Sequence, residues 1–310
     1  MMTQVFLAIV ETFGMFAIGA LVMHLKILDD KDLGKLSTLI VDIFFPMLAF
    51  DSIVRNFDPS QLKELWLMPT IGFGLMVFGG VLGFGLRYGM RNRTHDRMVT
   101  FHHFCAINNY LFLPLIILSN LSGEKYLALL FIMNIGSTIG FWTLGVGILA
   151  GGDVRRTFNN IFSINQAAVV LALIICFCKI PVPAVVMPLL VIVGNIFHKL
   201  GNCSVPLILL LIGAAIYHSP QIFKDKWDIF YMTAVRLIII PGIVILILNN
   251  LPLPADVYKV TYIVALMPVS ASSAVITRRY GGSAEFAGQS IIFTTVASLL
   301  TIPLMLLFMK

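Results

Sequence analysis

Two apolar stretches of the chain place polar side chains beside a proline. In AINNYLFLPL, residues 106–115, Asn108 and Asn109 precede Pro114. In MPVSASSAVITRRYGG, Pro268 is followed by three serines. A proline removes one backbone N–H and leaves carbonyls without partners, while amides, hydroxyls and the N-termini of half-helices are groups that bind an anion. The candidate substrate-binding residues are Asn108, Asn109, Pro114, Pro268, Ser270, Ser272 and Ser273.

The chain around these stretches has the composition of an integral membrane protein. Of its 310 residues, 59% are hydrophobic and only 12% are charged, which is too little polar surface for a soluble domain. Runs of about 20 apolar residues, each long enough to cross a hydrocarbon core of about 30 Å, recur from end to end. The ten predicted spans are residues 3–24, 33–54, 66–90, 98–119, 125–150, 161–178, 200–217, 229–249, 258–279 and 286–309. Residues 184–199 are either an interfacial helix or an extension of the seventh span.

The basic residues indicate how the spans are oriented. Lys and Arg are concentrated in the loops that follow the odd-numbered spans, so these loops are expected in the cytoplasm and both termini outside it. The net charge of +6 then reflects topology and contact with anionic lipid, and no nucleic-acid partner is expected. The predicted location is the cytoplasmic (inner) cell membrane, and neither a cofactor nor a metal site is expected.

A weak internal similarity divides the chain into two halves, residues 1–155 and 156–310. Pro46 in IFFPMLAF is matched by Pro206 in CSVPLILLL, and Pro114 is matched by Pro268. Five spans per half is an odd number, so the two copies insert with opposite topology, as in many secondary transporters. Each interruption lies about 10 residues, or about 15 Å, into its helix. The alternative is that each is a packing kink repaired by Ser or Asn.

Several ionisable residues fall in or near predicted spans, where a charge needs a partner or a function. Glu11 and Asp42 are expected at similar depth, and a like-charged neighbour favours the neutral form of a buried carboxylate. One hypothesis is that Asp42, with Glu11, carries a coupled proton; the other is a structural acid. Arg236 either snorkels to the interface or faces a cavity, where it pairs with Asp42 or attracts an anion. His102 and His103 are interpreted as interfacial.

These motifs resemble those of the auxin efflux carrier family, which includes bacterial malonate and malate permeases. The stretch ALMPVSASSAVITRRYGGSAEFAGQSIIFTTVASLLTIPL resembles the ninth and tenth helices of that family. IFFPMLAF and LGNCSVPLILLLIGAAI resemble its second and seventh helices, and NNYLFLPL resembles its broken fourth. Leu111 and Phe112 stand where relatives carry glycine.

The resemblance implies an all-α fold of ten transmembrane helices, arranged as two inverted five-helix repeats whose broken helices 4 and 9 cross. Helices 1, 2, 6 and 7 would form a scaffold that dimerises, and helices 3–5 and 8–10 a moving transport domain. The implied function is elevator-type secondary transport of small organic anions such as malonate, malate or auxin-like acids, in some members with protons. The implied partners are the anion, the lipid bilayer and a second copy of the chain.

Other functions are weighed against this one. A sodium-coupled symporter of the bile-acid type shares the architecture, but it would be expected to show carboxylate or Gln ligands at the crossing. An intramembrane enzyme is not expected, because the sequence contains no GxGD or HExxH motif. A channel or a membrane-bound sensor is the remaining alternative.

The proton-carrying role of Asp42 gives a first prediction. If Asp42 carries the coupled proton, Asp42→Asn abolishes uptake driven by a pH gradient, because an amide does not titrate. The measurement is uptake into proteoliposomes with and without that gradient. Full gradient-driven uptake in this variant would remove Asp42 from the role.

Overall fold

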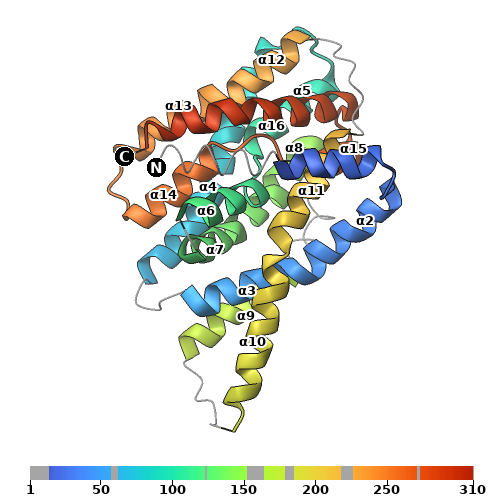
Figure 1. Ribbon diagram of the computed structural model, residues 1–310. Coiled ribbons are helices and arrows are strands. Elements are labelled where there is room, and N and C mark those ends of the chain that lie inside the picture. The colour runs from blue at the N-terminus through green and yellow to red at the C-terminus, as the bar shows by residue number, and fades with distance from the viewer. Residues whose placement is uncertain are drawn as a thin grey trace.

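The computed structural model describes residues 14–56, 62–122, 124–151, 164–178, 185–217, 226–270 and 273–309. Within these residues all regular structure is helical (Figure 1), which confirms the predicted all-α class. Extended pairing in this part of the chain is confined to one isolated antiparallel bridge, between Asn108 and Val269.

The helices follow one another with short connections. In the first half they are Gly14–His24, α2 (Asp30–Leu39), η1 (Ile40–Phe44), α3 (Phe45–Asn56), α4 (Leu62–Leu86), η3 (Arg87–Gly89), α5 (His95–Ala106), α6 (Phe112–Ser122), α7 (Glu124–Gly140), η4 (Phe141–Gly145) and α8 (Val146–Ala150). In the second half they are α9 (Ile164–Cys178), α10 (Met187–Asn202), α11 (Ser204–Tyr217), α12 (Lys226–Ala234), η6 (Val235–Ile239), α13 (Ile240–Leu248), α14 (Ala255–Ala265), α15 (Ser273–Tyr280) and α16 (Ala284–Leu306). The segments η1, η4 and η6 are π-helical and continue the α-helices beside them.

Membrane crossing is supported by the length and apolarity of the helices. Six described helices are long and apolar enough to cross a bilayer, and the helices Gly14–His24 and Ala167–Cys178 are shorter. The predicted spans 98–119 and 258–279 are each divided into two helices. The ambiguous segment 184–199 forms most of α10, which is separated from α11 by Cys203 alone. It is therefore an extension of the seventh predicted span, and its interpretation as an interfacial helix is wrong.

The helices pack in two groups. The scaffold group is Gly14–His24, α2, α3, α9, α10 and α11, in which α3 packs against α9 and α10, and α11 against α2. The crossing group is α4 to α8 and α12 to α16, in which α4 packs against α5, α7 and α14, and α16 against α12 and α15. The main contacts between the groups join α7 to α3 and α9, and α6 to α11. α9 and α10 extend to the end of the molecule opposite α12 (Figure 1).

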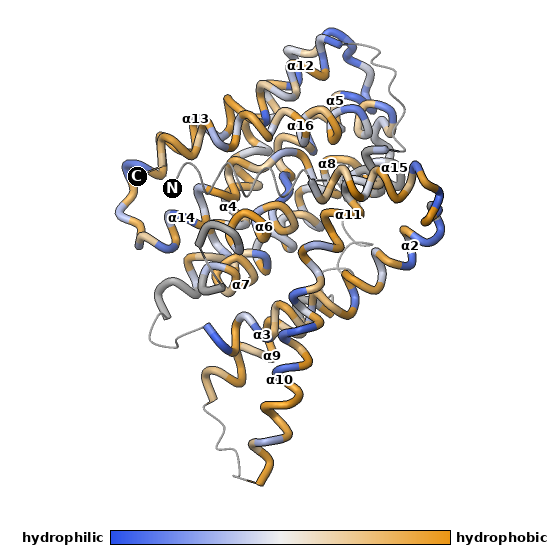
Figure 2. Tube along the Cα trace, viewed as in Figure 1, coloured by the Kyte–Doolittle hydropathy of each residue, from blue (hydrophilic) through white to orange (hydrophobic). Residues whose placement is uncertain are grey.

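Much of the outer surface is apolar. Figure 2 shows hydrophobic residues running along α10, α13 and α16, with hydrophilic residues gathered near the helix ends. On α10, Leu189 and Ile192 are exposed, as are Leu300 and Leu304 on α16. Surfaces of this kind are stable against lipid rather than water, so the exposed side chains fit a chain that lies in a bilayer.

A polar cluster around the buried Asp51 ties α3 to α10 inside the scaffold group. The carboxylate of Asp51 accepts hydrogen bonds from Arg55 Nε (2.6 Å) and from Nδ1 of His198 (2.8 Å). Arg55 also donates to the side chain of Asn195 (3.4 Å), and Asn202 contacts the other ring nitrogen of His198 (3.2 Å). Because Asp51 is buried, pairing with these groups offsets the cost of its desolvation.

Small residues let α4 and α7 approach closely. A Cβ atom on Gly72 would meet the backbone oxygen of Met133 (2.5 Å) and the hydroxyl of Ser137 (2.7 Å), and one on Gly136 would meet the backbone oxygen of Pro69. Interfaces of this type, in which backbones touch through glycine, are typical of helices in membranes. These contacts hold α7 in position, and α7 is the helix of the crossing group that packs most against the scaffold group.

We predict that Gly72→Ala destabilises the protein by about 1 to 3 kcal/mol, the usual cost of overpacking. The matched control is Gly74→Ala, two residues away on the same helix, where an added Cβ meets nothing within 4 Å. The measurement is the thermal unfolding midpoint of both variants in one detergent. Equal midpoints would show that the α4–α7 contact does not limit stability.

Candidate binding site at the helix crossing

Both interrupted helices break where the sequence predicts. α5 ends at Ala106 and α6 begins at Phe112, while α14 ends at Ala265 and α15 begins at Ser273. Pro268 helps to end α14, because a residue that precedes a proline rarely adopts the helical conformation. Pro114 lies in the first turn of α6, where a helix has no backbone bond to lose. It therefore helps to start α6 rather than kink a continuous helix.

The two interruptions cross and bond through their main chains. The backbone N–H of Asn109 donates to the carbonyl of Pro268 (2.8 Å), beside the antiparallel bridge between Asn108 and Val269. The backbone N–H of Val269 donates to the hydroxyl of Thr294 on α16 (3.4 Å). Backbone groups freed by the breaks thus find partners within the protein, which is the condition for irregular backbone at membrane depth.

The two asparagine side chains repair the ends of the half-helices. Asn108 Nδ2 donates to the carbonyl of Val264 on α14 (2.6 Å), and Asn109 Oδ1 accepts from the N–H of Leu113 (3.3 Å) and so caps α6. Each side chain uses only half of its amide in this way. Asn108 Oδ1 and Asn109 Nδ2 make no hydrogen bond to the residues that the structure describes.

Arg236 closes the carbonyl ends of both broken helices. Its Nε donates to the backbone carbonyl of Met267 (3.0 Å). One terminal nitrogen donates to the backbone carbonyl of Cys105 (3.1 Å), and the other donates to that of Ala265 (3.4 Å). The residue is 3% exposed, so the snorkelling interpretation is wrong. The predicted pairing with Asp42 is not found either, because its hydrogen bonds go to backbone carbonyls. The planar guanidinium has enough donors to bridge two chain segments at once.

The charge balance at the crossing follows from these contacts. The C-termini of α5 and α14 each carry about half a negative charge, and the N-termini of α6 and α15 about half a positive charge. The guanidinium of Arg236 offsets the two C-termini. The dipoles of the two N-termini remain, with one backbone N–H of α6 capped by Asn109, and together they supply up to about one positive charge. The crossing therefore has the electrostatics of a site for an anion.

A π-helical segment and a buried carboxylate position Arg236. It belongs to η6, and π-helical turns interrupt the regular helical hydrogen bonds and often mark functional sites. The helix that leads into η6 is held by Asp228, which accepts the backbone N–H groups of Arg91 (2.8 Å) and Asn92 (3.1 Å). Asp228 is fully buried, so this contact fixes the start of α12 against the loop before α5.

A buried histidine links the two halves of the chain at the crossing. Nδ1 of His103 lies 2.8 Å from the carbonyl oxygen of Gly145 in η4, and Nε2 lies 3.0 Å from the hydroxyl of Ser273. Both His103 and Ser273 are fully buried, so the interfacial interpretation of His103 is wrong. Ser273 is the first residue of α15, which places this pair at one of the two positive helix ends.

The remaining predicted site residues divide into three cases. Ser270 is buried at the crossing, and its carbonyl accepts the N–H of Ser273 (3.1 Å). Asp42 lies in η1 of the scaffold group, and its side chain is not covered by other described residues of the chain; its role in proton coupling stays a prediction. Ser272 and Glu11 lie outside the described residues.

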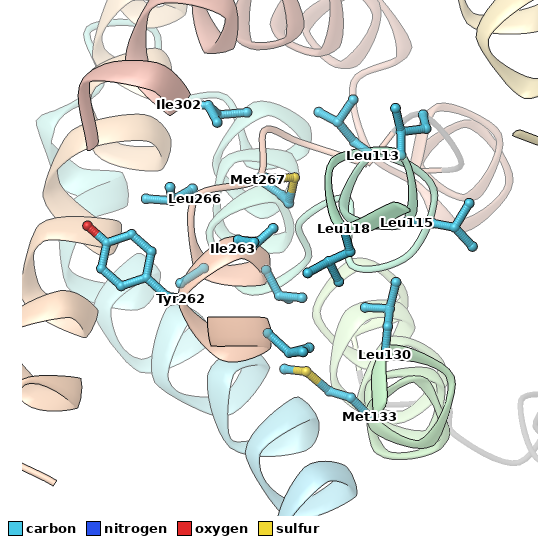
Figure 3. Close-up of a cluster of buried hydrophobic side chains, with 14 of the residues drawn as sticks. Leu113, Leu115, Leu118, Leu130, Met133, Tyr262, Ile263, Leu266, Met267 and Ile302 are labelled. Atoms are coloured by element: carbon cyan, nitrogen blue, oxygen red, sulfur yellow. The ribbon is translucent and has the colours of Figure 1, made fainter. Parts of the chain in front are cut away.

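Apolar side chains enclose the crossing. Figure 3 shows residues of α6, α7 and α14 gathered between these helices, among them Leu113 and Leu118 of α6, with Met267 just after the end of α14. On the other side of α6, the ring of Phe112 packs edge to face on Phe45 of α3, with centroids 5.3 Å apart. The polar groups of the crossing are thus surrounded by a hydrophobic shell, in which electrostatic interactions are stronger than in water.

The sequence alone did not reveal the roles of His103 and Arg236. His103 stands beside a second histidine near the basic loop, a pattern typical of an interface. Its position one helical turn before the break at Asn108 is the signal that would have identified it. Arg236 gave a clearer signal, since a charged residue within an apolar run needs a partner. No sequence pattern, however, predicts which carbonyls it bonds.

Fold and site together define a multi-pass membrane protein built around two crossed, interrupted helices. A family model described as membrane transport protein matches residues 4–167 and 156–306. An uncharacterized transporter of Methanothermobacter thermautotrophicus is 24% identical over 292 residues, covering 93% of this chain and 92% of its own length. An uncharacterized transporter of Methanocaldococcus jannaschii is 22% identical over 285 residues, with 90% of each chain covered. The chain belongs to the membrane transport protein family, the auxin efflux carrier family that its motifs resemble.

We predict that Arg236→Gln destabilises the protein by about 3 to 5 kcal/mol, because two helix ends lose a buried charged partner. Arg236→Lys is expected to have an intermediate effect, since an ammonium keeps the charge but cannot bridge three carbonyls as a planar fork does. Thermal unfolding in detergent measures both variants.

Arg93→Gln is the matched control, because Arg93 also donates to carbonyls, those of Tyr88 and Met90, but within a loop. It is expected to leave the unfolding midpoint close to that of the wild type. Equal midpoints for Arg236→Gln and the wild type would show that Arg236 does not hold the crossing together.

Proposed function

We propose that this protein is a secondary transporter of small organic anions, whose carboxylate binds at the helix crossing. The proposal rests above all on the contacts of Arg236, which occupies the carbonyl ends of α5 and α14. The positive N-termini of α6 and α15 are left to attract a negative ligand. Such N-termini at interrupted helices bind anionic groups in other transporter folds.

The side chains around these N-termini favour a carboxylate. Asn109 Nδ2 has no bond to a described residue and is a suitable donor to a carboxylate oxygen. The hydroxyl of Ser273 lies at the first residue of α15, and the apolar side chains of Leu111 and Phe112 adjoin Asn109 in sequence. A small acid with one carboxylate at the crossing and a compact remainder matches this combination. Malonate, malate and auxin-like acids all belong to that class.

The proposed architecture is ten membrane-crossing helices in two inverted repeats, residues 1–155 and 156–310. The order of elements supports it, because each half contains one broken helix, α5–α6 or α14–α15, followed directly by a long helix, α7 or α16. The excess of Lys and Arg in the loops after odd-numbered spans supports termini outside the cytoplasm and a place in the cytoplasmic membrane.

The proposed mechanism is alternating access, in which the crossing group moves against the scaffold group and carries the anion with it. The packing supports this division, because most helices contact members of their own group and the groups meet chiefly through α7 and α3. The exposed apolar residues of α10 support a scaffold that faces lipid or a second copy of the chain. A homodimer is therefore part of the proposal.

We predict uptake of at least one small carboxylate into proteoliposomes. The panel is acetate, malonate, malate and indole-3-acetate, tested for counterflow and for charge movement, with choline replacing sodium in a parallel series. Loss of uptake in choline would instead favour a sodium-coupled symporter. No response to any anion of the panel would refute the proposed function.

Asn109→Asp tests the binding site itself. An aspartate keeps the oxygen that caps α6 but replaces the amide donor, which bonds no described residue, with a negatively charged group, so uptake of the anion should fall about tenfold or more. Asn250→Asp is the matched control, since Asn250 is an exposed amide just after α13 that bonds the carbonyl of Leu246 in that helix. Equal uptake by Asn109→Asp and the wild type would place the anion elsewhere.

A further inference from the structure

We propose that His103 binds the proton that travels with the anion, and that it does so by reversing the hydrogen bond of Ser273. This inference rests on the proposed function and names a coupling residue for the same site. It is based on the geometry of the His103 ring, which is fixed on both sides inside the crossing.

The partners of His103 define which ring nitrogen carries the hydrogen. A carbonyl oxygen can only accept, so Nδ1, 2.8 Å from the oxygen of Gly145, must be the N–H donor. In the neutral ring Nε2 is then an acceptor, and the hydroxyl of Ser273, 3.0 Å away, donates to it. In this state the single hydroxyl hydrogen of Ser273 is directed at the histidine and is not available to a ligand.

Protonation changes the direction of this bond. A proton from water binds Nε2 and forms a new N–H, which donates to the oxygen of Ser273. The hydroxyl hydrogen of Ser273 is released and becomes a donor at the N-terminus of α15. No other covalent bond changes, and the same proton returns to water when the anion leaves. Proton binding therefore creates a donor for the anion and adds one positive charge beside it.

The effect is reciprocal, because the free energy that couples two bound species acts equally on both. An anion at the crossing stabilises the charged ring, and the charged ring stabilises the anion. Proton and anion are then carried together in the same direction. The site changes from about one positive charge, from two helix N-termini, to about two.

None of the described groups that bond to the ring of His103 is a carboxylic acid. Its two ring nitrogens are occupied by Gly145 and Ser273, and the ring of Phe141 packs beside it, with centroids 6.3 Å apart. The elements packed around it carry these titratable and charged groups: His95, Asp96, Arg97, His102 and Cys105 of α5, Arg87 and Tyr88 of η3, Arg236 of η6, the exposed Glu285 of α16, and Tyr280 of α15. Lys63 and Glu64 of α4 and Arg278 and Arg279 of α15 lie on the same elements, and their side chains are outside the described part. His102 is bonded to the carbonyl of Gly80 (2.8 Å) and serves as a matched comparison.

The test measures how the apparent affinity for the transported anion depends on pH. The probe is radiolabelled malonate, or whichever carboxylate of the panel gives counterflow, with equal pH on both sides of the membrane. If one proton binds with each anion, the apparent KM of the wild type rises as the pH rises. The increase is up to about tenfold for each pH unit in the range where His103 is neutral. His103→Gln is expected to give slower exchange whose KM does not change with pH. His102→Gln is expected to keep the wild-type pH dependence.

Ser273 provides an independent variant of the same bond. Ser273→Ala, which has no hydroxyl to reverse, is expected to raise KM and to flatten its pH dependence. Ser273→Thr restores a hydroxyl and is expected to restore the slope. A merely structural role of the histidine would alter rate and stability without changing the slope. A wild-type slope in folded His103→Gln protein would overturn the proposal, while the absence of any anion exchange by the wild type would overturn the proposed function first.

A readout that needs no anion completes the test. Nitrogen NMR of the protein labelled at histidine, with His103→Gln used for assignment, reports which ring nitrogen is protonated. The geometry predicts the Nδ1–H tautomer at alkaline pH and a doubly protonated ring on acidification. An Nε2–H tautomer for neutral His103 would contradict the proposed bond to Ser273, whatever the substrate is.

Discussion

The hydrogen bonds of one buried guanidinium make the crossing of the two broken helices possible. Two helices that end in the middle of a membrane protein expose carbonyls that no lipid can bond. Arg236 binds carbonyls from both of them and carries the charge that opposes their dipoles. Arg236 does not offset the dipoles at the N-termini of α6 and α15, so the contacts that hold the crossing together also support the proposed binding of an anion.

Much of the fold follows from patterns that the sequence displays directly. Within the described residues the apolar runs are helical, six helices are long and apolar enough to cross a bilayer, and both breaks fall beside the prolines that predict them. These features depend on local chemistry: apolar length, missing N–H groups and turn residues. The main-chain crossing was implied by the family resemblance alone, because a bond such as that between Asn109 and Pro268 joins residues far apart in the chain.

The candidate site was harder to predict because it depends on distance in space. Asn108 and Asn109 lie at the crossing as expected, but half of each amide repairs a helix end rather than facing a ligand. His103 lies next to His102 in sequence, yet one ring bonds a carbonyl of α4 and the other reaches α15. Only the packing of α5 separates these two environments. The exposure of Asp42 likewise depends on the rotation of its helix, which π-helical η1 alters.

The bond between the backbone of Asn109 and the carbonyl of Pro268 has a consequence for how such proteins diversify. It joins main-chain atoms, so it persists when the side chains beside it change. This part of the crossing therefore does not depend on the identity of the side chains beside it. Leu111 or Phe112 can therefore be exchanged for smaller or larger residues while this main-chain framework is kept.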